Sequence, residues 1–150
     1  MRNVILLSIA TLVVGCAPAV TTTSSGMSVD RVRVGQQWDI EFTLDGQRES
    51  GTFLVTQEGV PRACAANCGS LETMTTISVN VRGAESGDIT LMKYRDGRSQ
   101  ASFRALRLGR FDDAYCQVPL GSGQSTLKAN IKTGGATTYA DGSCRVLSAR

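Results

Sequence analysis

The stretch that decides the fold is residues 37–44, which read Gln-Trp-Asp-Ile-Glu-Phe-Thr-Leu. Its apolar side chains alternate with polar ones at every position, so that four of them share one face: Trp38, Ile40, Phe42 and Leu44. Successive side chains of a β-strand point to opposite sides, and strict alternation is typical of an antiparallel strand with one buried face. The stretch therefore predicts a half-buried β-strand.

Similar alternation recurs along the chain and is interrupted by turn-forming residues. We expect further strands at residues 51–57, 75–82, 88–94, 99–108, 114–118, 125–132, 137–140 and 143–147. Short strands spaced about 8–12 residues apart, with glycine-rich turns between them, are typical of barrels and sandwiches. The sequence therefore predicts an all-β fold, a small antiparallel barrel or sandwich of about eight strands.

The turns carry their own expectations. The Asp-Gly pair at 141–142 lies directly between two expected strands and predicts a tight hairpin. The Asp-Gly pair at 45–46 opens a loop that we expect to be longer than two residues. Within residues 99–108 the alternation shifts after Ala105, which indicates either a bulge or a short helix. Of these two we favour a strand with a bulge.

Composition limits the classes of protein that the chain can represent. Its 150 residues are 41% hydrophobic and 19% charged with a net charge of +3, which fits one globular domain and excludes a disordered chain. No apolar run reaches the roughly 18 residues of a membrane-spanning helix, which excludes a polytopic membrane protein. The chain contains no histidine, so mechanisms that need an imidazole base or metal ligand are excluded.

The N-terminus has the features of an export signal. Residues 1–15 combine Arg2 with an apolar run that is too short to span a bilayer. The following tetrapeptide, Val13-Val14-Gly15-Cys16, resembles the lipobox of bacterial lipoproteins. The resemblance implies that signal peptidase II cleaves before Cys16 and that acyl chains, palmitate among them, attach to Cys16 as a membrane anchor. It also implies a location in the cell envelope, on the inner or outer membrane, facing the periplasm or the exterior.

The domain boundaries follow from this anchor. Residues 16–32 begin with the lipidated cysteine and are otherwise small and rich in threonine and serine, which predicts a flexible tether. Residues 33–150 then form a single all-β domain.

Four cysteines remain in the expected β-domain: Cys64, Cys68, Cys116 and Cys144. An even number in an exported protein predicts two disulfides, and four cysteines allow three pairings. We favour Cys64–Cys68, which would close a short loop, and Cys116–Cys144, which would tie the last strand to an earlier one. A zinc site or a redox pair is the alternative, but structural zinc sites usually use two close cysteine pairs and only one is present here.

Two carboxylate pairs are candidates for chemistry. Asp39 and Glu41 stand two apart on one strand and could do acid–base work, although carboxylates on the polar face of a strand are usually solvated. Asp112 and Asp113 fall in an expected loop and could bind Ca²⁺, but without the spaced oxygen ligands of a calcium site a polar turn is the simpler interpretation. We therefore expect no catalytic residue, no cofactor and no metal.

A basic segment is the clearest candidate for binding. Six cations fall within a short stretch: Lys93, Arg95, Arg98, Arg104, Arg107 and Arg110. Such a stretch could bind an anionic lipid surface, an anionic envelope polymer or an acidic protein, whereas an export signal disfavours nucleic acid. It could also simply be a solvated strand edge that discourages aggregation.

These features predict a lipoprotein that is anchored in the cell envelope and carries a non-catalytic binding or structural β-domain. Its expected partners are membrane lipid, through the acyl anchor, and an envelope protein or anionic polymer. Two alternatives remain. Gly35-Gln36-Gln37-Trp38 resembles the Gly-x-Trp opening of lipocalin-like proteins and of small β-barrel inhibitors of bacterial metalloproteases, with one extra residue. One alternative is an inhibitor of an envelope hydrolase, for which a protruding loop at residues 60–70, rigidified by a disulfide, would be suited. The other is a carrier of a small lipid or other hydrophobic ligand, which needs an open barrel interior.

Overall fold

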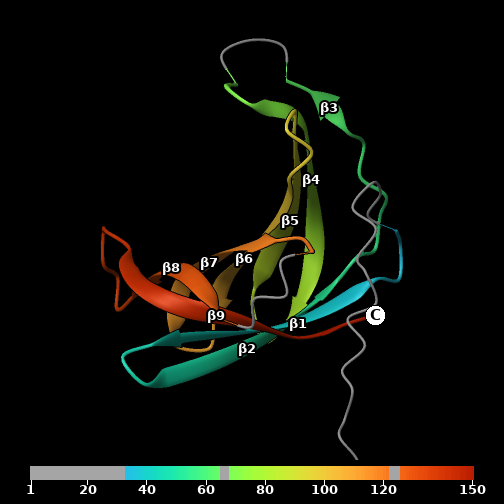
Figure 1. Ribbon diagram of the computed structural model, residues 1–150. Coiled ribbons are helices and arrows are strands. Elements are labelled where there is room, and N and C mark those ends of the chain that lie inside the picture. Colours follow the sequence, from blue (N-terminus) through green and yellow to red (C-terminus); the bar gives the residue numbers. More distant parts are fainter. Residues whose placement is uncertain (1–32, 65–67, 122–125) are drawn as a thin grey trace, which may run out of the picture.

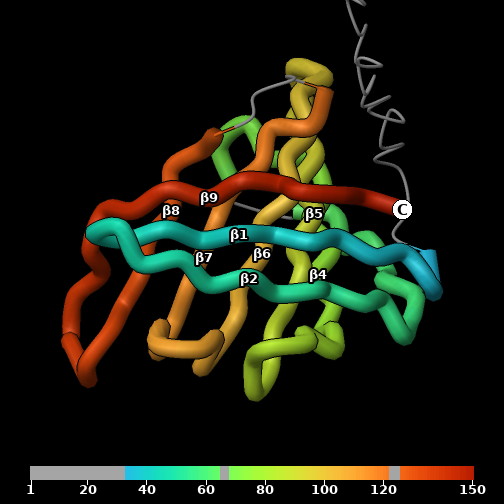
Figure 2. Tube along the Cα trace, turned by 90° about the horizontal axis from the view of Figure 1, so that it is seen from below, coloured from blue at the N-terminus to red at the C-terminus, as the bar shows by residue number. Residues whose placement is uncertain are grey.

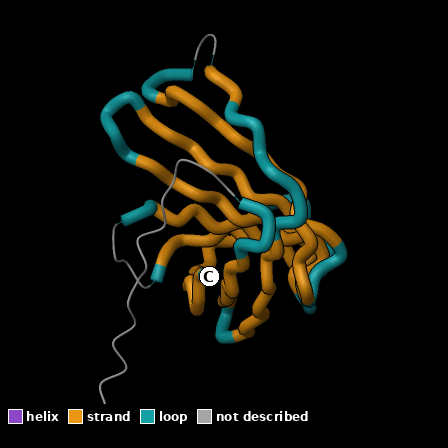
Figure 3. Tube along the Cα trace, turned by 90° about the vertical axis from the view of Figure 1, so that its right-hand side faces the viewer, coloured by secondary structure: helices purple, strands orange, loops and turns teal. Residues whose placement is uncertain are grey.

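The computed structural model describes residues 33–64, 68–121 and 126–150, so the expected signal peptide, Cys16 and the tether lie outside the described residues. The described chain forms strands and loops without a helix (Figures 1 and 3). Its strands are β1 (Gln37–Leu44), β2 (Gln47–Leu54), β3 (Arg62–Ala63), β4 (Leu71–Arg82), β5 (Ser86–Tyr94), β6 (Ser99–Leu108), β7 (Phe111–Pro119), β8 (Leu127–Thr133) and β9 (Ala140–Ala149).

All nine strands belong to one antiparallel sheet that closes on itself. The strand order is β2-β1-β9-β8-β7-β6-β5-β4-β3, and an additional pairing between β2 and β4 completes a ring. Figure 2 shows β9, β1 and β2 crossing in front of β4 to β7. The start of β1 lies beside the chain's C-terminus, where the Gln37 amide donates to the Arg150 carbonyl at 2.7 Å. The predicted all-β fold is thereby confirmed.

The core fills the inside of the ring. The four apolar residues of β1 are at most 6% exposed, as their alternation predicts. At the centre, the Phe103 ring lies 5.8 Å from the Trp38 ring and 5.3 Å from the Phe53 ring, between ring centroids. These tilted and edge-on arrangements are the ones that aromatic pairs prefer. The ring is therefore held together by a densely packed apolar interior.

The sheet continues beyond the ring as an extension, visible at the top of Figure 1. We define the extension as β3 together with residues 71–74 of β4, 91–94 of β5 and 99–100 of β6. None of these residues is buried. The ring is closed by only three residues of β4, since β2 pairs with β4 at residues 80–82 alone. The other end of β4 therefore extends beyond the ring. The extension is a sheet with two accessible faces.

Two turn predictions are wrong. The loop at Asp45-Gly46 has only two residues, because Leu44 pairs directly with Gln47. Both turn residues have positive φ, 49° and 78°, which a two-residue type I′ turn requires. The polar start of β2 gave no alternating pattern that would mark it as a strand. At the other Asp-Gly pair no hairpin forms, because β9 runs straight through Asp141 and Gly142.

The remaining irregular segment is a strand, as we favoured, but it contains no register shift against β7. Arg107 instead adopts a φ of 53°, which reverses the alternation so that Leu108 points inward. The actual bulge lies on β7, where pairing to β8 shifts between Phe111 and Asp113. β7 therefore begins earlier than the expected strand at residues 114–118.

Candidate functional site

The four cysteines lie in two pairs at disulfide distance. The Cα atoms of Cys64 and Cys68 are 6.0 Å apart, and those of Cys116 and Cys144 are 6.2 Å apart, within the usual disulfide range of about 4.4–6.8 Å. These are the two pairs that we favoured from the sequence. Cys116 and Cys144 are buried in the ring, where they link β7 to β9. Cys64 and Cys68 join β3 to β4 in the extension.

The structure does not gather the basic segment into one patch. Lys93, Arg95 and Arg98 lie at the end of the β5–β6 hairpin, in or beside the extension. Arg107 and Arg110 lie at the other end of β6, and ten residues of strand span about 30 Å. Five of the six cations are therefore divided between two ends of the molecule, and Arg104 lies between them on β6.

Three of these cations are also engaged by carboxylates. Arg98 pairs with Asp96 at 2.7 Å, Arg104 with Asp113 at 2.6 Å and Arg107 with Glu85 at 2.6 Å. Intramolecular pairing reduces what these side chains can offer to an anionic partner. The segment is thus less of a binding stripe than its sequence indicates.

Asp39 and Glu41 both lie on the outer face of β1 and both have structural partners. Asp39 accepts hydrogen bonds from Ser148 Oγ and from Thr52 Oγ1, the latter at 2.7 Å. These two bonds, that from Ser148 foremost, hold the pKa of Asp39 below its usual value. Glu41 accepts from Arg145 at 3.0 Å. Both carboxylates thus connect β1 to its neighbours, and the lowered pKa of Asp39 does not suit a general acid.

Asp112 and Asp113 are in strand β7, and the expectation of a loop is wrong for both. The bulge at this point turns Asp113 to the outer face while Ala114 and Cys116 point inward. Asp113 is only 7% exposed, and both of its oxygens accept hydrogen bonds from Arg104, at 3.0 and 2.6 Å. It is therefore the centre of a buried polar contact.

A polar network surrounds this ion pair. The Tyr139 hydroxyl donates to Asp113 at 2.7 Å, and Lys132 Nζ lies 4.4 Å from the centre of the Tyr139 ring. Burial raises the pKa of Asp113, but the hydrogen bonds from Arg104 and Tyr139 outweigh it and leave that pKa below its usual value. The hydrogen bond to Asp113 also raises the pKa of Tyr139. Asp113 thus stays ionised and fully satisfied.

Asp88 on the neighbouring strand β5 is in a different state. Its side chain is partly buried, and this burial raises its pKa, with a smaller opposing effect from Arg104. Within residues 33–64, 68–121 and 126–150, its carboxylate has no hydrogen-bond partner. Partly buried acids with raised pKa values are found preferentially at functional sites. Sequence reasoning placed Asp88 only at the start of a strand.

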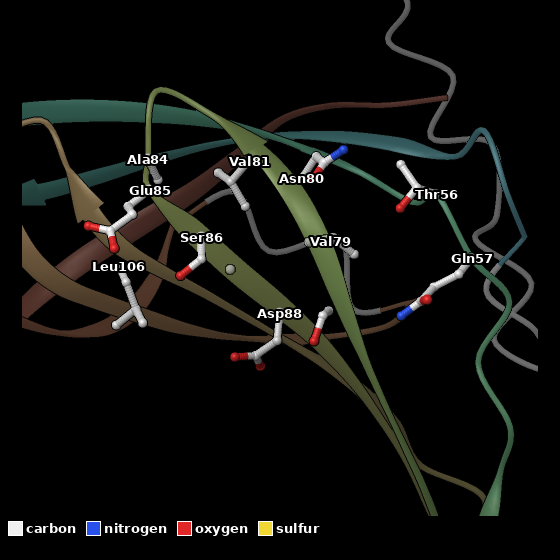
Figure 4. Close-up of a pocket in the computed structure, with 12 residues that line it drawn as sticks. Thr56, Gln57, Val79, Asn80, Val81, Ala84, Glu85, Ser86, Asp88 and Leu106 are labelled. Carbon is white, nitrogen blue, oxygen red and sulfur yellow. The ribbon is translucent and has the colours of Figure 1, made fainter.

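Asp88 also lines a groove of about 640 Å³ on the outside of the ring (Figure 4). The groove lies at the level where the pairing of β4 with β5 ends, at Val79, and its pairing with β2 begins, at Asn80. In Figure 4, Asn80, Thr56 and Gln57 lie toward one side, and Glu85 and Leu106 toward the other. Its remaining lining residues are Ser78, Val79, Val81, Ala84, Ser86 and Gly87.

Most polar groups in this groove are unengaged. In the part of the chain that the structure describes, the side chains of Gln57, Ser78, Asn80 and Ser86 make no hydrogen bond within the protein, and only Glu85 is ion-paired. The groove therefore offers hydroxyl, amide and carboxylate groups to a ligand. Alternating polar residues on β4 and β5 were the only sequence signal for it, and any solvated strand face gives the same signal.

The described residues include no group of three or more cysteine, aspartate or glutamate side chains that could hold a metal ion. They also include no helix that is long and apolar enough to cross a membrane. Comparisons with protein-family models, with curated proteins and with solved structures found no match to this chain.

Proposed function

We propose that this chain is a lipid-anchored protein of the bacterial cell envelope, whose β-domain binds a partner on its outer face and catalyses no reaction. The lipobox at Val13-Val14-Gly15-Cys16 supports the anchor, and two cysteine pairs at disulfide distance suit an oxidising compartment. The observation that carries the binding role is the outer groove with its unengaged polar groups beside Asp88.

The state of Asp88 supports binding because it has an energetic cost. Partial burial disfavours the ionised carboxylate, and no hydrogen bond from the described residues compensates for it. Asp113 on the same face shows that the fold can satisfy a buried carboxylate fully. A ligand that donates hydrogen bonds to Asp88 would remove this cost.

A carrier function receives less support. The inside of the ring is occupied by packed side chains, among which Phe42, Phe53, Phe103 and Phe111 are at most 1% exposed. A carrier would need that space for its ligand. The groove, by contrast, lies outside the ring.

An inhibitor of an envelope hydrolase is the second candidate. The Cys64–Cys68 pair lies in the extension, where two faces of the sheet are accessible. A cross-linked, rigid segment reduces the entropy lost on binding and would suit insertion into an enzyme. This candidate places the partner at the extension and not at the groove.

Site-specific cross-linking in cells distinguishes these positions. We would place a photoreactive residue at Ser86 in the groove, at Glu72 in the extension and at Arg48 on the exposed β1–β2 hairpin as the control. We expect a discrete adduct from Ser86 and none from Arg48. An adduct from Glu72 alone would favour the inhibitor, and no adduct at either test position would refute the binding role.

The anchor has a separate test. Cells grown with an alkyne-bearing palmitate should label the wild-type protein, and Cys16→Ser should abolish the label and leave the signal peptide uncleaved. A Cys64→Ser/Cys68→Ser variant serves as the control, because it removes two other cysteines and should keep the label. Labelling that survives Cys16→Ser would contradict the lipoprotein assignment.

A further inference from the structure

We propose that the partner is a neutral glycan, which lies across the outer face from the groove toward Tyr115. The inference rests on the proposed function and names the ligand class of the same face. It depends on the continuity of the face, on its charge and on the kinds of side chain that it presents.

The face is continuous because its residues lie directly opposite one another in the sheet. Ser78 pairs with Asp88, Asp88 with Arg104, Arg104 with Tyr115, and Tyr115 with Asn130. We call these five residues the cross-strand row. Neighbouring strands are about 4.8 Å apart, so the row extends about 19 Å over β4 to β8. Ser78 and Asp88 also line the groove, which therefore forms one end of the row.

The charges of this face nearly cancel. Its carboxylates are Glu85, Asp88, Asp113 and Asp141, and its cations are Arg82, Arg104, Arg107, Lys128 and Lys132. A strongly anionic or cationic ligand would gain little net attraction from such a surface. The binding of a neutral ligand does not depend on a net charge of the surface.

The side chains offer what a sugar requires. Sugar hydroxyls both donate and accept hydrogen bonds, and the row presents acceptors at Asp88, donors at the N–H groups of Arg104 that do not bind Asp113, and both kinds at Ser78 and Asn130. The ring of Tyr115 is partly exposed beside Arg104 and supplies a rigid apolar surface with a polar end, as does the side chain of Tyr139. A pyranose ring has matching apolar and polar surfaces.

A folded protein is a poorer fit to this face. Protein interfaces usually have an apolar, aromatic centre. Among the large hydrophobic residues that are exposed in the described chain, only Tyr139 and Leu54, which pairs with Asn80 at the rim of the groove, belong to this face, while Val34, Val60, Met74 and Leu147 lie elsewhere. Strands β5 to β8 are also paired on both sides beneath the row, so only residues 75–79 of β4, between its pairings with β3 and β2, offer a strand edge that a peptide could extend.

The test uses the lipidated full-length protein in detergent. The probes are the hexasaccharide of N-acetylglucosamine, cellohexaose, dextran and the neutral glycan fraction purified from the host's own envelope, with dextran sulfate as the charged comparison. We expect at least one neutral glycan to bind with an affinity that is unchanged between low and high salt, because no ion pair is formed. If no neutral glycan binds, or if dextran sulfate alone binds in a salt-sensitive manner, the inference is overturned.

Variants locate the site. Asp88→Asn and Ser78→Ala should each weaken glycan binding by about tenfold, the value of one well-placed hydrogen bond. Glu72→Gln, on the same strand β4 but in the extension, is the matched control and should leave affinity unchanged. Melting curves check that each variant is folded. Glycan binding that is insensitive to both groove variants would overturn the assignment to this face.

The cross-linking at Ser86 separates this inference from the proposed function. A glycan adduct supports both. A protein adduct would overturn the glycan and leave the binding role of the groove intact. The absence of any adduct, together with the absence of glycan binding, would end both.

Discussion

The ring and the extension belong to one continuous sheet but are stabilised in different ways. In the ring, each strand buries one face against the opposite side, and Phe103 at the centre is fully buried. In the extension, the same strands β4, β5 and β6 continue without an opposite side, and none of the extension's residues is buried, although Leu91 at its base packs against the core. The extension therefore depends on backbone pairing, on local polar contacts and on its cysteine pair. Backbone pairing allows a sheet to continue beyond its core, whereas the burial of apolar side chains supplies most of its stability.

The largest expected effect comes from truncating one apolar side chain in each region. Phe103→Ala should lower the free energy of unfolding by about 3–5 kcal/mol, because it removes a fully buried ring that packs on Trp38 and Phe53. Met74→Ala, on the exposed outer face of the extension, should cost less than about 1 kcal/mol. Urea titration of both variants measures the contrast. Equal losses would mean that the extension has a core of its own.

The two cysteine pairs allow the stability of the ring and of the extension to be compared directly. In the chain-entropy account, the Cys116–Cys144 link, with a sequence separation of 28, stabilises by about 3.6 kcal/mol, and the Cys64–Cys68 link, with a separation of 4, by about 2 kcal/mol. Replacing both members of a pair by alanine should follow that order in urea titrations. A larger loss for the extension pair would show that the extension supports the ring and is not merely attached to it.

The same regions explain what could be predicted from the sequence. The alternation of β1 is informative because every inward residue meets the core. The Asp-Gly pairs are not informative alone: at Asp45-Gly46 the chain turns, whereas at Gly142 it is paired to Ala129 and continues as a strand. A Cβ at Gly142 would lie 2.7 Å from the Thr43 carbonyl oxygen, so this glycine permits the close approach of β1. Packing by neighbours that are distant in sequence has overridden a local turn preference.

The groove could not be predicted for a related reason. It forms where the pairing of β4 with β5 ends at Val79 and its pairing with β2 begins at Asn80, and these limits are set by register and ring closure. Ser78, Ser86 and Asp88 look like any polar strand positions until the sheet is assembled. The basic segment shows the converse, because cations that are close in sequence lie toward the two ends of β6.

The ring and the extension also differ in how much an ion pair should contribute to stability. Arg104–Asp113 in the ring has an Asp113 side chain that is only 10% exposed, while Arg98–Asp96 beside the extension is open to solvent. Asp113→Asn should cost about 1–3 kcal/mol, because Arg104 and Tyr139 lose a charged acceptor. Asp96→Asn should change stability far less, because exposed pairs contribute little. Urea titration at neutral pH measures both.

The direction of the pKa shift of Asp113 determines how this ion pair's contribution to stability depends on pH. The pKa of Asp113 is lowered in the folded state, so its stabilisation is present above the ordinary carboxyl pKa of 3.8 and is lost as the pH falls through the lower folded value. In Asp113→Asn this acid-induced loss should be smaller than in the wild-type protein. An unchanged acid profile would show that the Arg104–Asp113 contact does not hold in solution.

Asp88 should show the smallest effect and the opposite sign. Its pKa is raised by burial, so the folded state binds this proton more tightly than the unfolded chain does. Stability from this group therefore increases as the pH falls through the raised value, and its ionised form is a cost at neutral pH. Asp88→Asn should stabilise the ring at neutral pH by less than about 1 kcal/mol, since solvent screens a partly exposed group, and the gain should disappear in acid. Thermal melting at neutral and acidic pH measures this change in stability.

A destabilised Asp88→Asn would make Asp88 a structural partner like Asp113, whereas a stabilised variant that no longer binds would show that the protein retains this carboxylate for its ligand.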